Sequence, residues 1–577
     1  MGLRAGLLRF AALIFAIIAL VGGLGAQESR REQRVTVFIS DLHFGVGHVD
    51  TGLFDGGRYT SGKWHPYEDF RWAVEFGKFL DELKIVGKEE NAPVELVVLG
   101  DMFELWQSPD AATCPIREEN KDLGCDESGA LQRLDRVLGA HKQEIAALRD
   151  FANTRENRLT IVPGNHDAAL VFPKVRKRVV DEIGANAGKV VVLADGYWLS
   201  RDGLIWAEHG HDAKEDVNHY AKLPASCINQ RKEPIDCDQP GAFLSRPWGE
   251  EFVQGYYNQH EITYPIIDNV LGEGNAVSYA ISEARIIDVA SALAKGVKFL
   301  LTDQSLDQFV TLLGKQGTQG KAVDTLGGKE GYRPRWDIDL VRAKADTTFL
   351  LNSFVNDRSY MVQEAKRLAL EGKLDLSGSL KEFANEDFDR LCQYRYLRWR
   401  DKPEAQRSEA DLCPVLEPEK FKELGAATRN LLHTNADLDK ARVSSRVDII
   451  KQKFPGLTGN FSYYIYGHTH AATTARPVST DDSSWNPQMI NTGAWQRVAS
   501  ARQLYKIFLD LKGDEKTAGV LRQEPEKLPP CYSYVYIGPY EKSRPEPKLL
   551  YWVLEDPKQN RWGPSIACPR EYEAALP

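Results

Sequence analysis

The feature that most constrains this chain is a short apolar run that ends abruptly in residues of the kind that bind metals. Residues 35–39 are rich in β-branched and aromatic side chains, and Asp41 and His43 follow them at once. Such a run favours a strand that is buried on both faces. If the strand geometry continues this far, the two side chains project to the same side of the strand end. A carboxylate and an imidazole held there form half of a metal site.

The same pattern returns four times along the chain. Strand-like runs at 94–99, 159–162, 204–207 and 461–466 precede, in order, Gly-Asp, Gly-Asn-His-Asp, His-Gly-His and Gly-His-Thr-His. Helical periodicity between the runs, at 66–83 and 131–151, predicts alternating strands and helices and therefore a layered α/β sheet. Further strands are expected at 189–194, 197–200, 489–490, 503–511, 534–537 and 549–553.

Collected, these strand ends offer carboxylate, amide and imidazole ligands. The candidate metal ligands are Asp41, His43, Asp101, Asn165, His209, His468 and His470. This mixture suits Mn, Fe or Zn better than Ca. The set is larger than one ion needs, so two divalent ions that share a carboxylate are expected. Asp101, on a middle strand, is the natural bridge between them.

The length and charge of the chain limit the alternatives. At 577 residues the chain exceeds the usual size of one core, so an inserted domain or several units are expected. Residues 213–455 break the strand-plus-ligand pattern and are mostly helical by periodicity. We therefore predict an α-helical insertion, a candidate cap, between core segments 27–212 and 456–577. A net charge of −9 argues against nucleic acid as partner but permits a small anionic substrate beside a metal.

The N-terminus and the cysteines point to export. Residues 1–26 carry Arg4 and Arg9 before an apolar stretch that ends in small residues, as in a signal peptide. An uncleaved anchor, which would associate the protein with a membrane, is the alternative. The eight cysteines form neighbouring couples, and in a periplasmic or extracellular protein we expect sequential disulfides. The couples are Cys114 with Cys125, Cys227 with Cys237, Cys392 with Cys413, and Cys531 with Cys568.

The ordered set of Asp-x-His, Gly-Asp, Gly-Asn-His-Asp, His-Gly-His and Gly-His-Thr-His resembles the calcineurin-like metallophosphoesterase family. The resemblance covers residues 34–212 and 456–512 and implies a four-layer αββα sandwich with a di-metal site at the rim of the sheet. It implies one ion held by Asp41, His43, Asp101 and His470, and a second held by Asp101, Asn165, His209 and His468. His166 would contact the phosphate or protonate the leaving oxygen, and Asp41 could polarise it. The implied activity is hydrolysis of phosphoester or pyrophosphate bonds by a metal-activated water.

Within that family, the motifs are nearest to the group of UDP-2,3-diacylglucosamine diphosphatases. Residues 100–106 resemble that group's GDLFEAW segment, and residues 491–495 resemble its NLGDW. The chain departs from the group in three ways: His211 replaces an Asp, the insertion is far longer, and the leader exports the protein. The reaction class therefore carries over and the substrate does not, beyond a small anionic phosphate compound linked to a lipid or a nucleotide.

Several other polar residues are assigned to the surroundings of the metals. Glu104 and Trp106 are expected to support the loop that carries Asp101. His209 fits the ligand position better than its neighbour two residues on. The candidates for substrate contact are His211, His48, His65 and Asn491.

Two other classes of function remain open from the sequence. A scaffold or binding module could keep this fold and lose catalysis, although the presence of every ligand type argues against that reading. A nuclease is the rival among enzymes, and the acidic composition without a basic stripe argues against it.

Overall fold

The computed structural model describes most of the two segments expected to form the core, together with the beginning and the end of the long stretch between them. The described residues are 34–48, 63–109, 113–116, 121–212, 218–271, 433–457, 459–482, 484–499, 503–504, 507, 510–512, 520–540 and 545–568. The expected leader 1–26 lies outside these residues. Among the described helices, none is long and apolar enough to serve as a membrane span.

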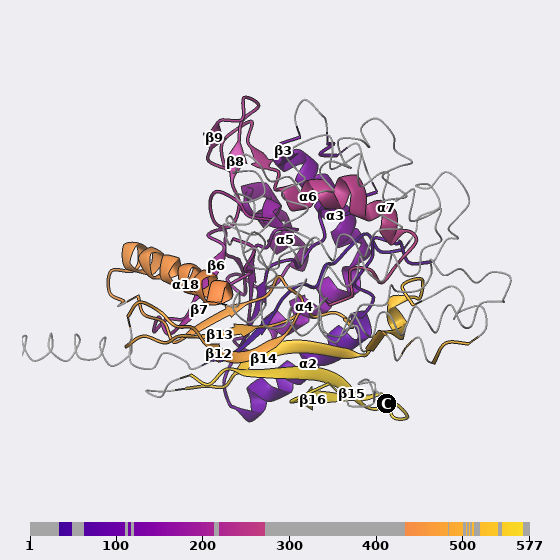
Figure 1. The fold of residues 1–577 in the computed structure, drawn as a ribbon. Coiled ribbons are helices and arrows are strands. Elements are labelled where there is room, and N and C mark those ends of the chain that lie inside the picture. The colour runs from indigo at the N-terminus through magenta and orange to yellow at the C-terminus, as the bar shows by residue number, and fades with distance from the viewer. Residues whose placement is uncertain are drawn as a thin grey trace, which may run out of the picture.

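A mixed seven-stranded sheet forms the centre of the molecule (Figure 1). Its strand order is β16-β15-β14-β1-β2-β4-β5. Strands β1, β2, β4 and β5 pair in parallel, and β14 pairs with β1 in the antiparallel direction. The strands are β1 (Val35–Ile39), β2 (Val94–Leu99), β4 (Arg158–Val162), β5 (Val190–Val192), β14 (Cys531–Ile537), β15 (Lys548–Asp556) and β16 (Arg561–Ser565).

A five-stranded sheet packs against this central sheet. Its order is β12-β13-β11-β7-β6, with β11 parallel to both β7 and β13. Phe38 of β1 and Val97 of β2 share one buried apolar cluster with Ala207 of β7 and Ile465 of β11. The two sheets therefore meet face to face. The strands are β6 (Tyr197–Leu199), β7 (Ile205–Glu208), β11 (Tyr463–Tyr466), β12 (Thr473–Pro477) and β13 (Gln488–Asn491).

Helices cover the outer face of each sheet. Val35, Val37 and Ile39 of β1 point away from the second sheet, with the period of two that a strand imposes, and pack against helices. These helices are α2 (Ala73–Glu89), α3 (Glu127–Ala140), α4 (Lys142–Asn153) and α5 (Pro173–Ile183). On the other side, Val443 and Ile450 of α18 (His433–Lys453) pack against the five-stranded sheet, and α18 lies beside β6 and β7 at the left of Figure 1.

The described start of the 213–455 stretch contains strands as well as helices. It adds β8 (Cys227–Ile228), β9 (Pro234–Ile235) and β10 (Phe243–Ser245) to β3 (Leu123–Asp126) in a small sheet, followed by α6 (Trp248–Phe252), a π-helical turn η3 (Val253–Tyr257) and α7 (Asn258–Glu261). These strands have only two or three residues each, which is too short to show a hydrophobic period. They also form one sheet with β3, which lies about a hundred residues earlier in the chain. The helices expected between 277 and 432 lie outside the described residues.

Three of the expected disulfides are present and are therefore confirmed. They join Cys114 to Cys125, Cys227 to Cys237 and Cys531 to Cys568. The expected pair of Cys392 and Cys413 lies outside the described residues. Disulfides of this kind indicate an oxidising compartment outside the cytoplasm.

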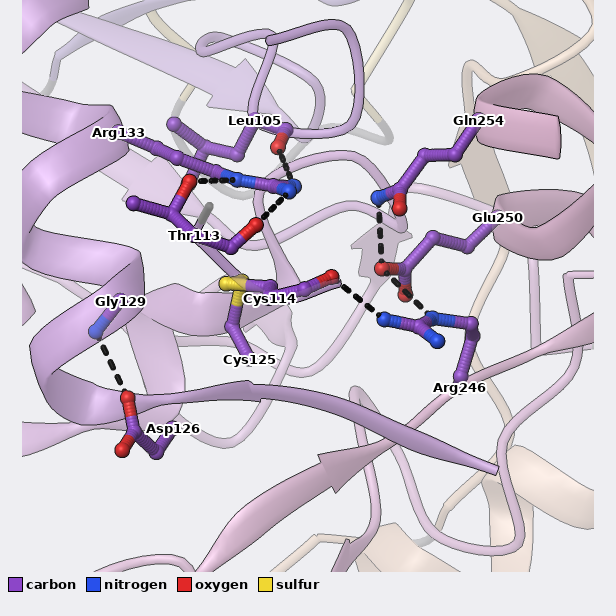
Figure 2. Close-up of a disulfide and its surroundings, with 10 residues drawn as sticks. All are labelled: Leu105, Thr113, Cys114, Cys125, Asp126, Gly129, Arg133, Arg246, Glu250 and Gln254. Carbon is purple, nitrogen blue, oxygen red and sulfur yellow. Dashed lines mark hydrogen bonds and ion pairs between the residues drawn. A yellow bond between two sulfur atoms is a disulfide. The ribbon is translucent and has the colours of Figure 1, made fainter. Parts of the chain in front are cut away.

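The Cys114–Cys125 disulfide fixes the small sheet to the core (Figure 2). The carbonyl of Cys114 accepts a hydrogen bond of 2.8 Å from the Arg246 guanidinium, which also pairs with Glu250. On the other side, Arg133 of α3 donates to the carbonyls of Thr113 and Leu105. The loop before β3 is therefore held by two buried guanidinium groups as well as by the covalent bond.

Two expectations about local structure were wrong. The strand expected at 503–511 is not formed, because the described residues 503, 504, 507 and 510 are helical. Leu504, Ile507 and Leu511 pack in one cluster at a spacing of three and four residues, which is the period of a helix. The helix expected over 131–151 is two helices, α3 and α4, which meet at His141.

Candidate metal centre

The first pair of candidate ligands, Asp41 and His43, lies beyond the end of strand β1. Strand β1 ends at Ile39, and the backbones of Asp41 and His43 have φ values of 54° and 48°. The expectation that strand geometry continues to these residues is therefore wrong. The left-handed turns are held by hydrogen bonds from the amides of Asp41 and His43 to the carbonyls of Gly100 and Asp101, at 3.1 and 2.9 Å. The two side chains converge through these turns rather than through the pleat.

Asp101 follows β2 in a loop that only glycine permits on two sides. Gly100 has a φ of 80°, and a Cβ there would lie 2.4 Å from the His209 ring. A Cβ on Gly164 would lie 2.2 Å from Oδ1 of Asp101. These contacts explain why Gly precedes the ligand in the second and third motifs. The absence of side chains lets the two loops and the imidazole approach one another.

The Asp167 carboxylate holds the loop that carries Asp101 through hydrogen bonds to backbone amides. The carboxylate is fully buried and accepts hydrogen bonds from the amides of Gly164, Met102 and Phe103, at 2.6, 2.8 and 3.3 Å. Burial and the neighbouring Asp101 raise the pKa of Asp167 to about 6. The motif analysis assigned no separate role to this last residue of the Gly-Asn-His-Asp motif.

The five-stranded sheet supplies the remaining imidazoles. His209 follows β7, and its Nδ1 lies 2.7 Å from the carbonyl of Leu99, which places the proton on Nδ1. His468 and His470 follow β11, and Asn491 holds their loop by donating to the carbonyl of Gly467 and to Thr469. The hydrogen bond from His209 to a backbone carbonyl is the kind that orients metal-binding histidines.

The loops from the two sheets bring the candidate ligands into two adjoining groups. One contains Asp41, His43 and His470, and the other contains Asp101, His209 and His468, with ligand atoms in each group within 4.8 Å of one another. Oδ2 of Asp101 lies 2.9 Å from Nε2 of His209 and 3.8 Å from Nε2 of His43. Asp101 therefore stands between the groups. Asn165 joins the second, with Oδ1 2.9 Å from Nε2 of His209.

Backbone strain is concentrated at these positions. Among the described non-glycine residues with positive φ are five of the candidate ligands: Asp41, His43, Asp101, His468 and His470. Each such residue costs on the order of 1–3 kcal/mol and persists where the surrounding structure enforces it. Strain of this kind gathers at functional sites. The packing of the surrounding core therefore holds these residues in strained backbone conformations that fix the positions of their side chains.

Glu104 links two histidines of the site. Its Oε2 lies 2.9 Å from Nδ1 of His43 and 2.5 Å from Nδ1 of His166, and its Oε1 accepts the amide hydrogens of Trp106 and Gln107. The His166 ring stacks on Trp106 with centroids 4.1 Å apart. The sequence predicted support of the loop for Glu104 and missed its bond to the imidazoles. The carboxylate beside His166 is that of Glu104, and the suggested role of Asp41 as its partner finds no contact here.

Burial and charge shift the pKa values of these groups in opposite directions. Burial would lower the pKa of His43, but its hydrogen bond to Glu104 and the charges of Asp101 and Glu104 raise it to about 10. Burial is likewise outweighed at His209, where Asp101 raises the pKa to about 9. For Asp101, burial would raise the pKa, and the charges of His209 and His166 hold it well below its usual range. In the metal-free site, these shifts favour an ionised Asp101 beside protonated His43 and His209.

The residues present fit divalent metal ions. Oδ1 of Asp41 and Nε2 of His43 are buried and make no hydrogen bond. Nε2 of His209 faces two oxygens, those of Asp101 and Asn165, while its Nδ1 is committed to a carbonyl. A cation among these atoms would satisfy all of them at once. Buried His, Asp and Glu groups in this arrangement could therefore form a metal site, and they do not specify which metal it is.

The candidates for substrate contact lie in different surroundings. His211 is 1% exposed, and its Nε2 lies 2.8 Å from the carbonyl of Pro224. His65 is also buried, and its Nδ1 accepts the amide hydrogen of Tyr67. His48 is exposed and stacks on Trp64. Asn491 is buried and its side chain is bonded within the loop of His468 and His470. His211 and Asn491 lie beside the candidate ligands: the ring centroid of His211 is 5.3 Å from that of His209, and Asn491 bonds to Thr469 between His468 and His470.

Comparison of the chain with family models, with curated proteins and with solved structures found no match.

Proposed function

We propose that this protein is an exported, metal-dependent hydrolase of phosphoester or pyrophosphate bonds. The layers of helix, sheet, sheet and helix and the order of the ligand loops agree with the four-layer arrangement that the motif resemblance implies. The core would consist of residues 27–212 and 456–577 together with α18 (433–453), which forms the outer layer on the five-stranded sheet although it lies within the stretch predicted as the insertion, 213–455. The three disulfides support export to the periplasm or the cell exterior.

One observation carries the proposal: loops at the ends of strands from both sheets bring seven ligand-type side chains together. Asp41, His43, Asp101 and His470 would hold one ion, and Asp101, Asn165, His209 and His468 the other. Manganese, iron and zinc all suit these donors. Two such ions would supply an activated water and neutralise charge on the phosphoryl oxygens.

The chain's own residues would then position the substrate and handle the proton. His166 is partly exposed, and Glu104 and Trp106 fix its ring, so its Nε2 is the atom available for a leaving oxygen. The substrate would be a small anionic phosphate compound. Linkage to a lipid or to a nucleotide fits the motif resemblance.

The start of the insertion supports a role as a cap. Glu261 and Asp268 lie close to Gln107, whose amide bonds to Glu104 of the candidate metal centre. Residues 261–268, about fifty residues into the 213–455 stretch, therefore lie beside the site. A structure of the whole insertion docked away from His209 and His468 would contradict this part of the proposal.

The proposal is tested by an activity panel on protein reconstituted separately with Mn, Fe and Zn. Substrates would span nucleotide diphosphate sugars, phospholipid headgroups, simple phosphomonoesters and bis-p-nitrophenyl phosphate. We expect metal-dependent hydrolysis of at least one class, abolished in Asp101→Ala. The exposed Asp195→Asn, whose carboxylate pairs with Lys453, is the matched control and should retain activity.

The same panel separates the rival functions. A scaffold would carry no bound metal and show no hydrolysis after metal addition. A nuclease would degrade single-stranded DNA in a plain digestion at rates above those for the small substrates. Either result would replace the proposed function.

A further inference from the structure

A cleft lies between the two sheets, at the side where β5 and β6 form the last strand of each. It has a volume of about 710 Å³, within the range of sites for small molecules, and is lined by residues of β2, β4, β5 and β6. Glu95 lies near the first residue of β2, whereas Asp101 of the candidate metal centre follows the last residue of the same strand. Six residues of extended chain span about 20 Å, so the cleft is separate from the metal centre.

The lining of the cleft is polar where the space between two packed sheets is normally apolar. Along β2, Val97 and Leu99 face the second sheet, and the period of two places Glu95 on the same face. On β4, Thr160 stands on that face with Val162. Glu95 and Thr160 are 8% and 2% exposed. Packing between the sheets does not require a carboxylate here, because an apolar side chain would fill the same space without losing hydration.

The chain does not neutralise the charge of Glu95. Its Oε1 accepts hydrogen bonds from the hydroxyl of Thr160 at 2.7 Å and from Nε1 of Trp198 at 3.4 Å. Within the described part of the chain, no donor reaches its Oε2, and no lysine or arginine forms an ion pair with it. A buried carboxylate is normally paired with a cation. Oε2 is therefore available to a positively charged group in the cleft.

Arg158 supplies an opposite charge to the same cleft. It stands directly across from Glu95 in the parallel pairing of β2 and β4, and both residues line the cleft. Its guanidinium has neither a hydrogen bond nor an ion pair with any described residue, Glu95 included. Two neighbouring charges of opposite sign are thus held apart, and each lacks a partner. A ligand that carries both an anionic and a cationic group would satisfy both.

We propose that this cleft binds a free α-amino acid with an apolar or aromatic side chain. Its ammonium group would meet Oε2 of Glu95, and its carboxylate would accept hydrogen bonds from the Arg158 guanidinium. These two groups of an amino acid are separated by one carbon atom, which suits partners on adjacent strands about 4.8 Å apart. The side chain would lie against Trp198, Leu193 and Phe454, of which Phe454 is a large apolar residue left exposed. Binding here does not depend on the proposed hydrolase activity.

The test is isothermal titration calorimetry of the full-length protein with L-phenylalanine. We expect a dissociation constant of about 10⁻⁵–10⁻⁴ M, as for a ligand of this size. Phenylpropionate lacks the ammonium group and phenylethylamine lacks the carboxylate, so each should bind at least about tenfold more weakly. These measurements use the unaltered protein and therefore do not depend on how a variant folds.

Two variants assign the charges to their residues. Glu95→Gln keeps an oxygen for Thr160 and Trp198 and removes the charge, so it should weaken phenylalanine binding at least about tenfold and leave phenylpropionate binding unchanged. Arg158→Met should weaken phenylalanine binding to a similar extent and leave phenylethylamine binding unchanged. The surface variant Glu555→Gln, whose carboxylate pairs with Arg561, is the matched control and should bind phenylalanine normally.

Asp101→Asn separates this proposal from the proposed function, because it alters the candidate metal centre and should leave phenylalanine binding intact. Loss of binding in this variant would place the ligand at the metal centre and overturn the proposal. An absence of heat at millimolar phenylalanine would show that Glu95 and Arg158 need no ligand, and would overturn it too. Phenylpropionate or glutamate that binds as tightly as phenylalanine would contradict the assigned ligand class.

Discussion

Two buried carboxylates near His209, those of Glu208 and Asp101, show how a structural charge differs from a functional one. Glu208 ends β7 and is fully buried, and the Arg446 guanidinium of α18 meets it with Nε and Nη2 at 2.9 and 2.8 Å. Asp101, which contacts the next residue, His209, has no such partner. It faces imidazoles, in a site where Oδ1 of Asp41 and Nε2 of His43 make no hydrogen bond.

The difference lies in where the counter-charge comes from. Burial would raise the pKa of Glu208, but Arg446 and a hydrogen bond from Tyr464 lower it, so the chain itself stabilises this anion. At the candidate metal centre the counter-charge comes from imidazoles, which can give up their protons and bind a cation instead. Burial of a carboxylate therefore does not mark a site by itself. Unsatisfied atoms that converge beside it do.

The largest effect is expected from Asp101→Asn. Loss of the shared carboxylate should lower kcat/KM at least about 10³-fold, or about 4 kcal/mol of transition-state stabilisation. Because the charges of His209 and His166 hold the pKa of Asp101 low in the metal-free fold, the variant also loses a stabilising interaction, and the apo protein should be less stable than the wild type. Activity on bis-p-nitrophenyl phosphate and chemical unfolding of the apo form measure the two quantities. Near-normal activity would break the comparison.

Arg446→Met should have the opposite profile. It leaves the Glu208 carboxylate buried without its partner, which costs about 3–5 kcal/mol of unfolding free energy. The metal content of the folded protein should stay unchanged. Lys440→Met on the same helix is the control, since Lys440 pairs with the exposed Asp481 and its loss should cost less than about 1 kcal/mol. Equal destabilisation by both variants would show that the Glu208 pair is not special.

Glu104→Gln tests the link between the two histidines. A neutral amide holds the Nδ1 atoms of His43 and His166 less well, so metal affinity or activity should fall about 10–100-fold. The pH profile of kcat should shift as well, because the Glu104 carboxylate raises the pKa of His43 and the neutral amide does not. Glu526→Gln, at an exposed carboxylate, serves as the control. A variant with an unaltered pH profile would assign Glu104 to loop support alone.

The smallest effect concerns His141, which is balanced by the chain as Glu208 is. Burial would lower its pKa, but Glu68 and Glu144 raise it from 6.5 to about 10. Since the folded-state pKa is higher, the stabilisation is complete below pH 6.5 and is lost as the pH rises towards 10. The loss should be on the order of 1 kcal/mol for each pH unit between 6.5 and 10. Unfolding of chelated protein at several pH values should show a slope that His141→Gln reduces; an equal slope in both would contradict this.

The parts of the fold that local sequence determines were predicted well. Strand β2 has the bounds expected from its apolar run, 94–99, and three cysteine couples pair as their spacing suggested. Runs of β-branched residues and short covalent loops depend on neighbours in sequence. For the same reason, the ends of these strands could be identified as the source of the candidate ligands.

Features that depend on distant contacts could not be predicted. The left-handed turns at Asp41 and His43 are set by hydrogen bonds to the loop after β2, some sixty residues away. Glu104 reaches His166 across a similar distance, and nothing in its own motif separates this role from loop support. Residues 503–511 were predicted as a strand because apolar side chains stand at alternate positions there, whereas Leu504, Ile507 and Leu511 also recur at the spacing of a helix.

The central claim is that the two groups of ligands hold a pair of metal ions between the loops of two sheets. A crystal structure of the manganese-loaded protein, with the ions located by their anomalous scattering, tests it most directly. We expect two peaks about 3.5–4 Å apart, with Asp101 in contact with both. No peak between Asp41 and His209, or peaks only at surface carboxylates, would contradict the account.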